Sequence, residues 1–174
     1  MITPMSWFER EFRLDLPLSM YPNVVERVRG TPARLEDRLL PLSQREIFTQ
    51  RTGDKWSIQE HVGHLLDLGT LDSGRLDDYE TGLEILRSAD LENRKTHEAN
   101  HNANSLERIL KEFRAERSAF ARRLDTYDAG FIARTALHPR LKQPMRVLDL
   151  IFFIAEHDDH HLARIGELIK NSDK

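Results

Sequence analysis

The C-terminal third of the chain carries a long apolar stripe at helical spacing, and two histidines stand within that stripe. Steps of three and four residues place all of its members on one face of a helix. The members are Val147, Leu150, Ile151, Ile154, His157, His161, Ile165 and Leu168. A buried helix has no structural need for two imidazoles one turn apart, whereas their ring nitrogens can hold one metal ion. The spacing therefore predicts a buried helix with a metal site on it.

Three other stretches have the same helical periodicity. One begins at Val24 and is expected to be interrupted or kinked at residues 30–32, where Gly30 and Pro32 stand. The next follows a capping box formed by Ser57 and Glu60 and is expected to run to about residue 82. The third spans residues 105–127, and the C-terminal helix is expected over about residues 145–170. Residues 7–14 form a short amphipathic piece, and residues 135–144, which contain two prolines, are expected to be a loop.

Four apolar stripes predict an all-α fold, a four-helix bundle with a short N-terminal addition. A length of 174 residues favours a single domain over 1–174. The composition, 39% hydrophobic and 32% charged, suits a globular protein. A net charge of −3 without a basic stripe argues against nucleic acid as a partner. No apolar run reaches the roughly 20 residues of a membrane span, and the first residues lack the features of a signal peptide, so a cytoplasmic location is expected.

Because the chain has no cysteine, a transition metal would have to use nitrogen and oxygen ligands. Two imidazoles bind an ion weakly, so a third ligand is needed. His64 is the candidate on the apolar side of the second helix, and His61, one turn earlier, is its rival. Spacing does not separate the two. His160 stands one position off the stripe and should flank the site or face solvent.

Residues 97–101, HEANH, match the H-E-x-x-H motif of zinc proteases. That motif works only on a helix packed against a core, with the glutamate placed as a general base. Here the neighbouring residues are polar and rich in asparagine, and no apolar stripe supports the segment. We therefore interpret it as a solvated helix end or loop and not as a protease site.

Two motifs resemble those of the DinB superfamily, in particular its YfiT-like branch. Residues 55–65, KWSIQEHVGHL, resemble a W-S-x-x-E-x-x-x-H-L signature. Residues 138–140, HPR, followed by residues 157–162, HDDHHL, resemble a second signature, a histidine followed by a double histidine. Residues 31–35, TPARL, also fit that branch. The resemblance covers roughly residues 21–168.

The resemblance implies an up-down-down-up four-helix bundle and a metal held by three histidines. Carried over by position, the ligands are His64, His157 and His161, which selects His64 over His61. Arg164 departs from the glutamine that relatives often have, although it is not at a ligand position. Members of the family include metal-dependent hydrolases, bacillithiol S-transferases and mycothiol-dependent isomerases, so the family predicts the site better than the substrate.

Three imidazoles leave one to three coordination positions open, which points to catalysis or ligand binding and not to a closed structural site. We expect a divalent transition metal, zinc or nickel ahead of iron, cobalt or copper. Carboxylates near the ligands in sequence could orient them, although each is expected to be a solvated surface acid, apart from Glu60, which should cap its helix. These acids are Glu60, Asp67, Glu156, Asp158 and Asp159.

The leading prediction is a metal-dependent enzyme that activates a thiol, as an S-transferase, with a water-activating hydrolase close behind. A non-catalytic metal-binding or small-ligand-binding stress protein is the second class, and a bundle whose histidines merely pack is the third. The expected partners are a small-molecule substrate, including a low-molecular-weight thiol, and a second copy of the chain in a homodimer. No general base is assigned.

Overall fold

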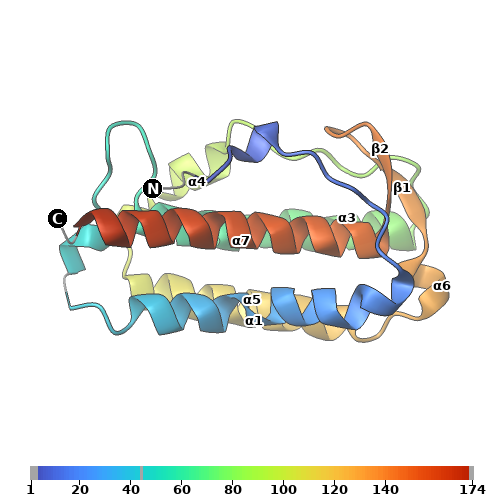
Figure 1. The fold of residues 1–174 in the computed structure, drawn as a ribbon, viewed down its shortest axis with the longest axis horizontal. Helices are drawn as coiled ribbons and strands as arrows, with labels where there is room; N and C mark the ends of the chain where they lie inside the picture. Colours follow the sequence, from blue (N-terminus) through green and yellow to red (C-terminus); the bar gives the residue numbers. More distant parts are fainter. Residues whose placement is uncertain (1–3, 44, 173–174) are drawn as a thin grey trace.

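The computed structural model describes residues 4–43 and 45–172, and its long helices lie side by side as a bundle (Figure 1). Helices α2 and α3 follow each other along one position of the bundle. Helix α1 packs against α5 and α7, and α2 packs against the same two helices. The bundle consists of α1 (Tyr21–Leu39), α2 (Ile58–Asp67) with α3 (Gly69–Glu80), α5 (Leu106–Leu124) and α7 (Val147–Ser172). The predicted four-helix bundle is confirmed.

The helices follow an up-down-down-up order. Helices α1 and α7 run in one direction, and α2–α3 and α5 run in the other (Figure 1). Two helices that run the same way cannot be joined by a tight turn, so α3 and α5 need a long connection, residues 81–105. This connection carries α4 (Arg94–Ala99) and a 3₁₀ turn (His101–Ala103), and both pack against α2.

The helix boundaries differ from the expected ones in three places. Helix α1, which was expected to be interrupted or kinked at residues 30–32, continues through Pro32 to Leu39. The second helix, expected to be continuous, is divided at Leu68 into α2 and α3. Residues 7–14 contain only a 3₁₀ turn, Trp7–Glu9. The remaining short elements are 3₁₀ turns at Leu18–Met20 and Arg45–Phe48 and a helical turn, α6, at Ala129–Ile132.

Residues 135–146 form a β-hairpin where a loop was expected. Strand β1 (Thr135–His138) pairs antiparallel with β2 (Gln143–Arg146), with Thr135 opposite Arg146 and His138 opposite Gln143. Leu137 also exchanges backbone hydrogen bonds with residues 84 and 86, so the hairpin is attached to the long connection. Pro144 lies inside strand β2. Proline is rare in strands except at a sheet edge, so the sequence favoured a loop here.

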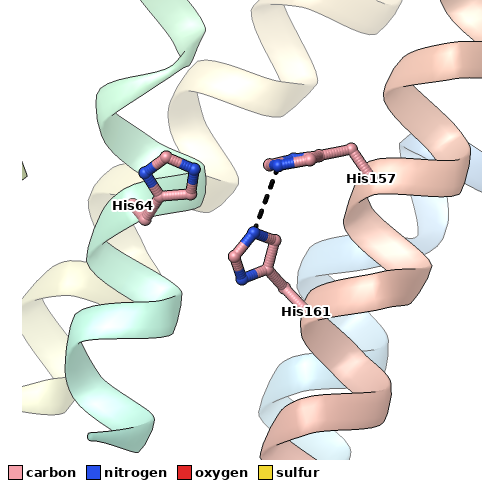
Figure 2. A group of neighbouring side chains, drawn as sticks. All are labelled: His64, His157 and His161. Atoms are coloured by element: carbon pink, nitrogen blue, oxygen red, sulfur yellow. Dashed lines mark hydrogen bonds between the residues drawn. The ribbon is translucent and has the colours of Figure 1, made fainter. Parts of the chain in front are cut away.

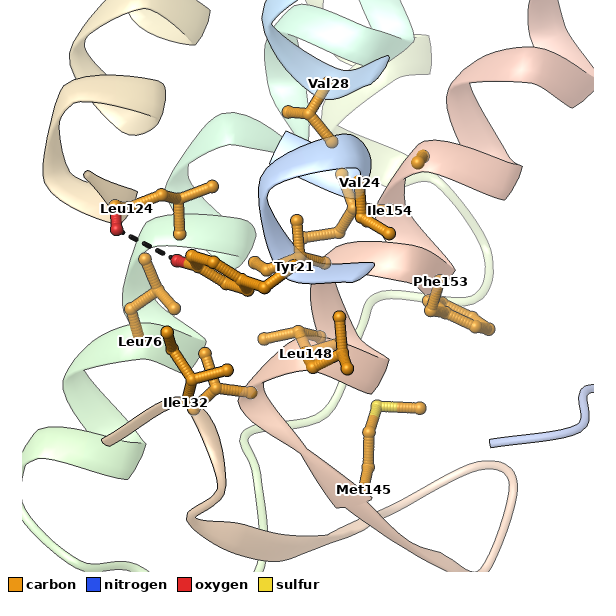
Figure 3. Packing of buried hydrophobic residues seen from close by; sticks show 14 of the residues in the cluster. Tyr21, Val24, Val28, Leu76, Leu124, Ile132, Met145, Leu148, Phe153 and Ile154 are labelled. Carbon is orange, nitrogen blue, oxygen red and sulfur yellow. Dashed lines mark hydrogen bonds between the residues drawn. The ribbon is translucent and has the colours of Figure 1, made fainter. Parts of the chain in front are cut away.

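Two apolar clusters fill the bundle. One lies around the first halves of α1 and α7 and is closed by the Tyr21 hydroxyl, which donates to the Leu124 carbonyl at 2.9 Å (Figure 3). The other lies around α2, the second half of α1 and the first half of α5. None of the described helices combines the length and apolar character needed to span a membrane.

A layer of buried polar side chains lies between the two clusters. It contains one residue from each of α1, α3, α5 and α7. Arg117 of α5, only 1% exposed, donates to Asp158 of α7 at 3.2 Å and to Asp72 of α3 at 3.4 Å. The Thr31 hydroxyl of α1 donates to the other oxygen of Asp158 at 2.7 Å. Burial opposes the charge on Arg117, but its carboxylate neighbours raise the pKa of this guanidinium above its ordinary value. The layer therefore joins all four positions of the bundle through one cation.

Replacement of Arg117 by leucine should lower the free energy of unfolding by about 3–5 kcal/mol, because it leaves two buried carboxylates without a cation. The matched control is Arg108→Leu on the same helix, where an exposed guanidinium donates to Glu112 at 2.8 Å. The control should change stability very little. Urea unfolding followed by circular dichroism measures both variants, and equal losses would contradict a special role for the layer.

Candidate metal centre

His64, His157 and His161 come together between α2 and α7, with their rings turned towards one another (Figure 2). One ring nitrogen from each lies within 4.8 Å of those of the other two. The Nε2 atoms of His157 and His161 are 3.2 Å apart, a separation expected for two nitrogens bound to one ion at about 2.0–2.1 Å each. Within the described residues, these three histidines are the only group of potential ligands that converges in this way.

The second nitrogen of two of these rings is held by a neighbouring side chain. His64 Nδ1 lies 3.1 Å from the Thr96 hydroxyl of α4, which leaves Nε2 of His64 free. His161 Nδ1 lies 2.8 Å from Nδ1 of His61. Such partners fix the ring orientation and the tautomer of a metal ligand. His61, the rival ligand in the sequence, therefore contacts a member of the converging group and does not belong to it.

Burial keeps the clustered imidazoles neutral. Desolvation lowers the pKa of His64 to about 4, with smaller and opposing effects of Asp67 and nearby histidines. Desolvation, followed by repulsion from neighbouring imidazoles, also lowers the pKa of His157 and of His161 well below 6.5. At neutral pH the three rings therefore carry free nitrogen lone pairs, which is the protonation state that a metal ion requires.

The H-E-x-x-H segment is not a second site of this kind. Helix α4 ends at Ala99, and Asn100 takes a left-handed conformation with φ 46°, so His97 and His101 do not share a helical face. His97 is exposed, as expected. The expectation of a solvated segment is wrong for His101, which is buried against Gly63 and lies 2.8 Å from Asp67 Oδ2.

The residue directly before this segment, Thr96, is one that sequence reasoning overlooked. Its position next to an apparent protease motif drew attention to the histidines of that motif instead. Thr96 is buried and reaches His64 from α4, so the long connection contributes to the site through a hydroxyl and not through an imidazole.

The acids near the ligands in sequence have structural partners elsewhere. Glu60 completes the predicted capping box with Ser57 and also pairs with Arg51. Asp159 and Glu156 pair with arginines of α1 and of the N-terminal segment. Asp158 is 1% exposed within the polar layer, so its expected position at the surface is wrong. In the part of the chain that the structure describes, no carboxylate is hydrogen-bonded to the three histidines.

A pocket of about 430 Å³ opens beside the three histidines. Its wall near them is aromatic. The Trp56 ring lies 4.7 Å from that of His64, and the Trp7 ring lies 4.7 Å from that of His157. Half-buried His160 also lines this pocket, in agreement with its expected flanking position. The volume suits a small organic molecule, and its apolar walls would limit the access of water to the histidines.

Comparisons with known proteins agree with this architecture. Residues 27–165 match the DinB superfamily. A Bacillus subtilis protein described as "a probable metal-dependent hydrolase with an unusual four-helix bundle topology" is 17% identical, with a TM-score of 0.81 over 95% of this chain and 94% of that one. A mycothiol-dependent maleylpyruvate isomerase is 12% identical, with a TM-score of 0.64 over 85% of this chain and 60% of that one. No curated protein matches the chain in sequence.

Substitution of Gly63 by alanine should destabilise the protein by about 1–3 kcal/mol, because the added Cβ would meet the buried His101 ring at 2.2 Å. The matched control is Gly30→Ala in α1, where an added Cβ meets nothing within 4 Å. That control should gain up to about 1 kcal/mol from better helix propensity. Urea unfolding of the metal-free variants tests both, and a Gly63→Ala protein as stable as Gly30→Ala would contradict the packing of α4 on α2.

Proposed function

Because the chain belongs to the DinB superfamily, we propose that it is a metal-dependent enzyme that holds a divalent transition metal through His64, His157 and His161. The observation that carries the proposal is the convergence of three neutral imidazoles at the wall of a pocket large enough for an organic molecule. A closed structural site would use four protein ligands and would need no such pocket.

The donor set fits such an ion. Three imidazole nitrogens suit zinc or nickel, and they also suit iron, cobalt or copper. Thr96 and His61 would hold the rings of His64 and His161 with their other nitrogens turned inwards. His64 comes from α2, which leads directly into α3, and the Arg117 layer joins α3 to α7, the helix of His157 and His161. The three rings would therefore need little reorganisation when the metal binds.

The proposed reaction is activation of a thiol, as in an S-transferase, with activation of water for hydrolysis as the second candidate. A bound divalent ion supplies a Lewis acid that lowers the pKa of a coordinated thiol or water. The side chains of the pocket would orient the second substrate, and Trp7 and Trp56 would exclude bulk water. The thiol dependence of the isomerase neighbour supports the first reaction, and the description of the Bacillus subtilis neighbour supports the second.

Replacement of His64, His157 or His161 by alanine should each abolish stoichiometric metal binding, because two imidazoles hold an ion weakly. His97→Ala is the control, since this exposed histidine lies outside the converging group and should keep its metal. Elemental analysis after dialysis against zinc or nickel measures occupancy. Loss of metal in His97→Ala with retention in His64→Ala would place the site in α4 and overturn the assignment.

The enzymatic proposal is tested with chelator-treated protein, alone and reloaded with zinc or nickel. A chromogenic aryl halide is offered with cysteine, glutathione or coenzyme A, and p-nitrophenyl acetate is offered with water alone. Turnover should disappear with the chelator, return with metal and stay absent in His64→Ala. A protein that binds one metal per chain but turns over none of these substrates would instead be a binding module, whereas full turnover without metal would reject metal dependence.

A further inference from the structure

A second group of polar side chains lines the same pocket outside the three-histidine group. Arg75 comes from α3, and His138 and Arg140 come from the β-hairpin. His138 stands 63 positions after Arg75 in the chain, and the fold brings α3 and the hairpin together at one wall of the pocket. None of them has a role in the metal proposal.

The buried donors of this group lack partners. His138 is 2% exposed, and its Nδ1 accepts the backbone N–H of Leu141 at 3.2 Å, so the ring proton resides on Nε2. That Nε2 has no hydrogen-bond partner among the described residues, and the same holds for Nη2 of Arg140. Buried donors without partners carry a desolvation cost that a bound acceptor would remove.

The two arginines of this wall also lack a carboxylate partner. Arg75 is 3% exposed and donates from Nε to the Arg87 carbonyl at 3.2 Å. Within residues 4–43 and 45–172, neither Arg75 nor Arg140 forms an ion pair within 4.0 Å. Both guanidiniums therefore present charge to the pocket without the fixed anion that buried cations normally have.

The charge around this wall has a small positive excess. The pocket is lined by three basic residues, Arg75, Arg140 and Lys142, and by three acids, Asp72, Asp90 and Asp158. Arg117 also pairs with Asp72 and Asp158, so four cations stand against three anions, which leaves one positive charge. A single excess charge matches a monoanion better than a dianion.

Phe153 lies between this group and the metal ligands. Its ring is 5.1 Å from that of His138 and 5.0 Å from that of Trp7, and Trp7 in turn lies 4.7 Å from His157. Phe153 precedes His157 by one turn of α7, about 6 Å along the helix axis. The two polar groups of the pocket are therefore separated by an aromatic surface about one ring in length.

We propose that Arg75, His138 and Arg140 form a carboxylate-binding subsite, and that the substrate is an organic monocarboxylate whose apolar part lies against Trp7 and Phe153. Arginine forks and the imidazole N–H would donate to the carboxylate oxygens, as such groups do in other proteins. The role of this ligand as a substrate rests on the proposed function. Binding of the carboxylate itself needs only the arginine and histidine donors.

The test compares phenylacetate with phenylacetamide, which has the same shape but no charge, by isothermal titration calorimetry on metal-free and zinc-loaded protein. Phenylacetate should bind in both states, at least tenfold more tightly than phenylacetamide. Arg140→Gln should weaken phenylacetate binding about tenfold or more, since one charged hydrogen-bond donor is lost. Arg75→Gln should do the same, and Arg108→Gln on the exposed face of α5 should leave the affinity unchanged.

Arg140 is half-buried, so its variant provides the decisive result if the more buried Arg75→Gln protein fails to fold. Binding that requires zinc and is unaffected in Arg140→Gln would mean that the carboxylate binds the metal, and it would overturn the subsite. Equal affinity for the acid and the amide would overturn it as well, as would tighter binding of inorganic phosphate. If the protein holds no metal but Arg140-dependent binding persists, the metal proposal fails while the subsite stands.

Discussion

The contact on which the rest of the structure depends is the buried guanidinium of Arg117, shared between Asp158 and Asp72. A buried charge is costly unless it has a partner of opposite charge. The helices that carry Arg117, Asp158 and Asp72 therefore keep the relative positions in which these three side chains meet. Asp158 directly follows His157, and successive helical residues differ by about 100° in direction. Directing Asp158 towards Arg117 therefore fixes the rotation of α7 that turns His157 and His161 towards α2.

The direction of the helices has a second consequence for the site. Because α3 and α5 run the same way, the chain must return along the bundle before α5 can begin, and residues 81–105 do so beside α2 (Figure 1). The absence of a side chain at Gly63 lets His101 lie against α2, and Thr96 then reaches His64. A topological requirement thus supplies a hydrogen-bond partner to one of the three histidines.

The pocket combines two chemical environments that come from distant parts of the chain. The neutral imidazoles of α2 and α7 offer nitrogen lone pairs to a metal ion. The wall formed by α3 and the hairpin instead offers positively charged hydrogen-bond donors. Trp7 and Phe153 separate the two environments with aromatic surface. A molecule that binds between them would have one end at the three histidines and the other at the arginines, which restricts both its length and its charge.

Local periodicity in the sequence determined the four helical positions, the Ser57–Glu60 cap and the common face of His157 and His161, because these depend on residues within one or two turns. Spacing left His64 and His61 as alternatives, and only the resemblance favoured His64. Tertiary structure decided that His61 supports His161 and that Thr96 supports His64. It also placed Asp158 in the core and folded residues 135–146 into a hairpin. The histidine contacts and the burial of Asp158 depend on partners more than 30 positions away, which helical periodicity does not encode. The hairpin pairs residues 5 to 11 positions apart, but it is attached to distant residues 84 and 86 through Leu137.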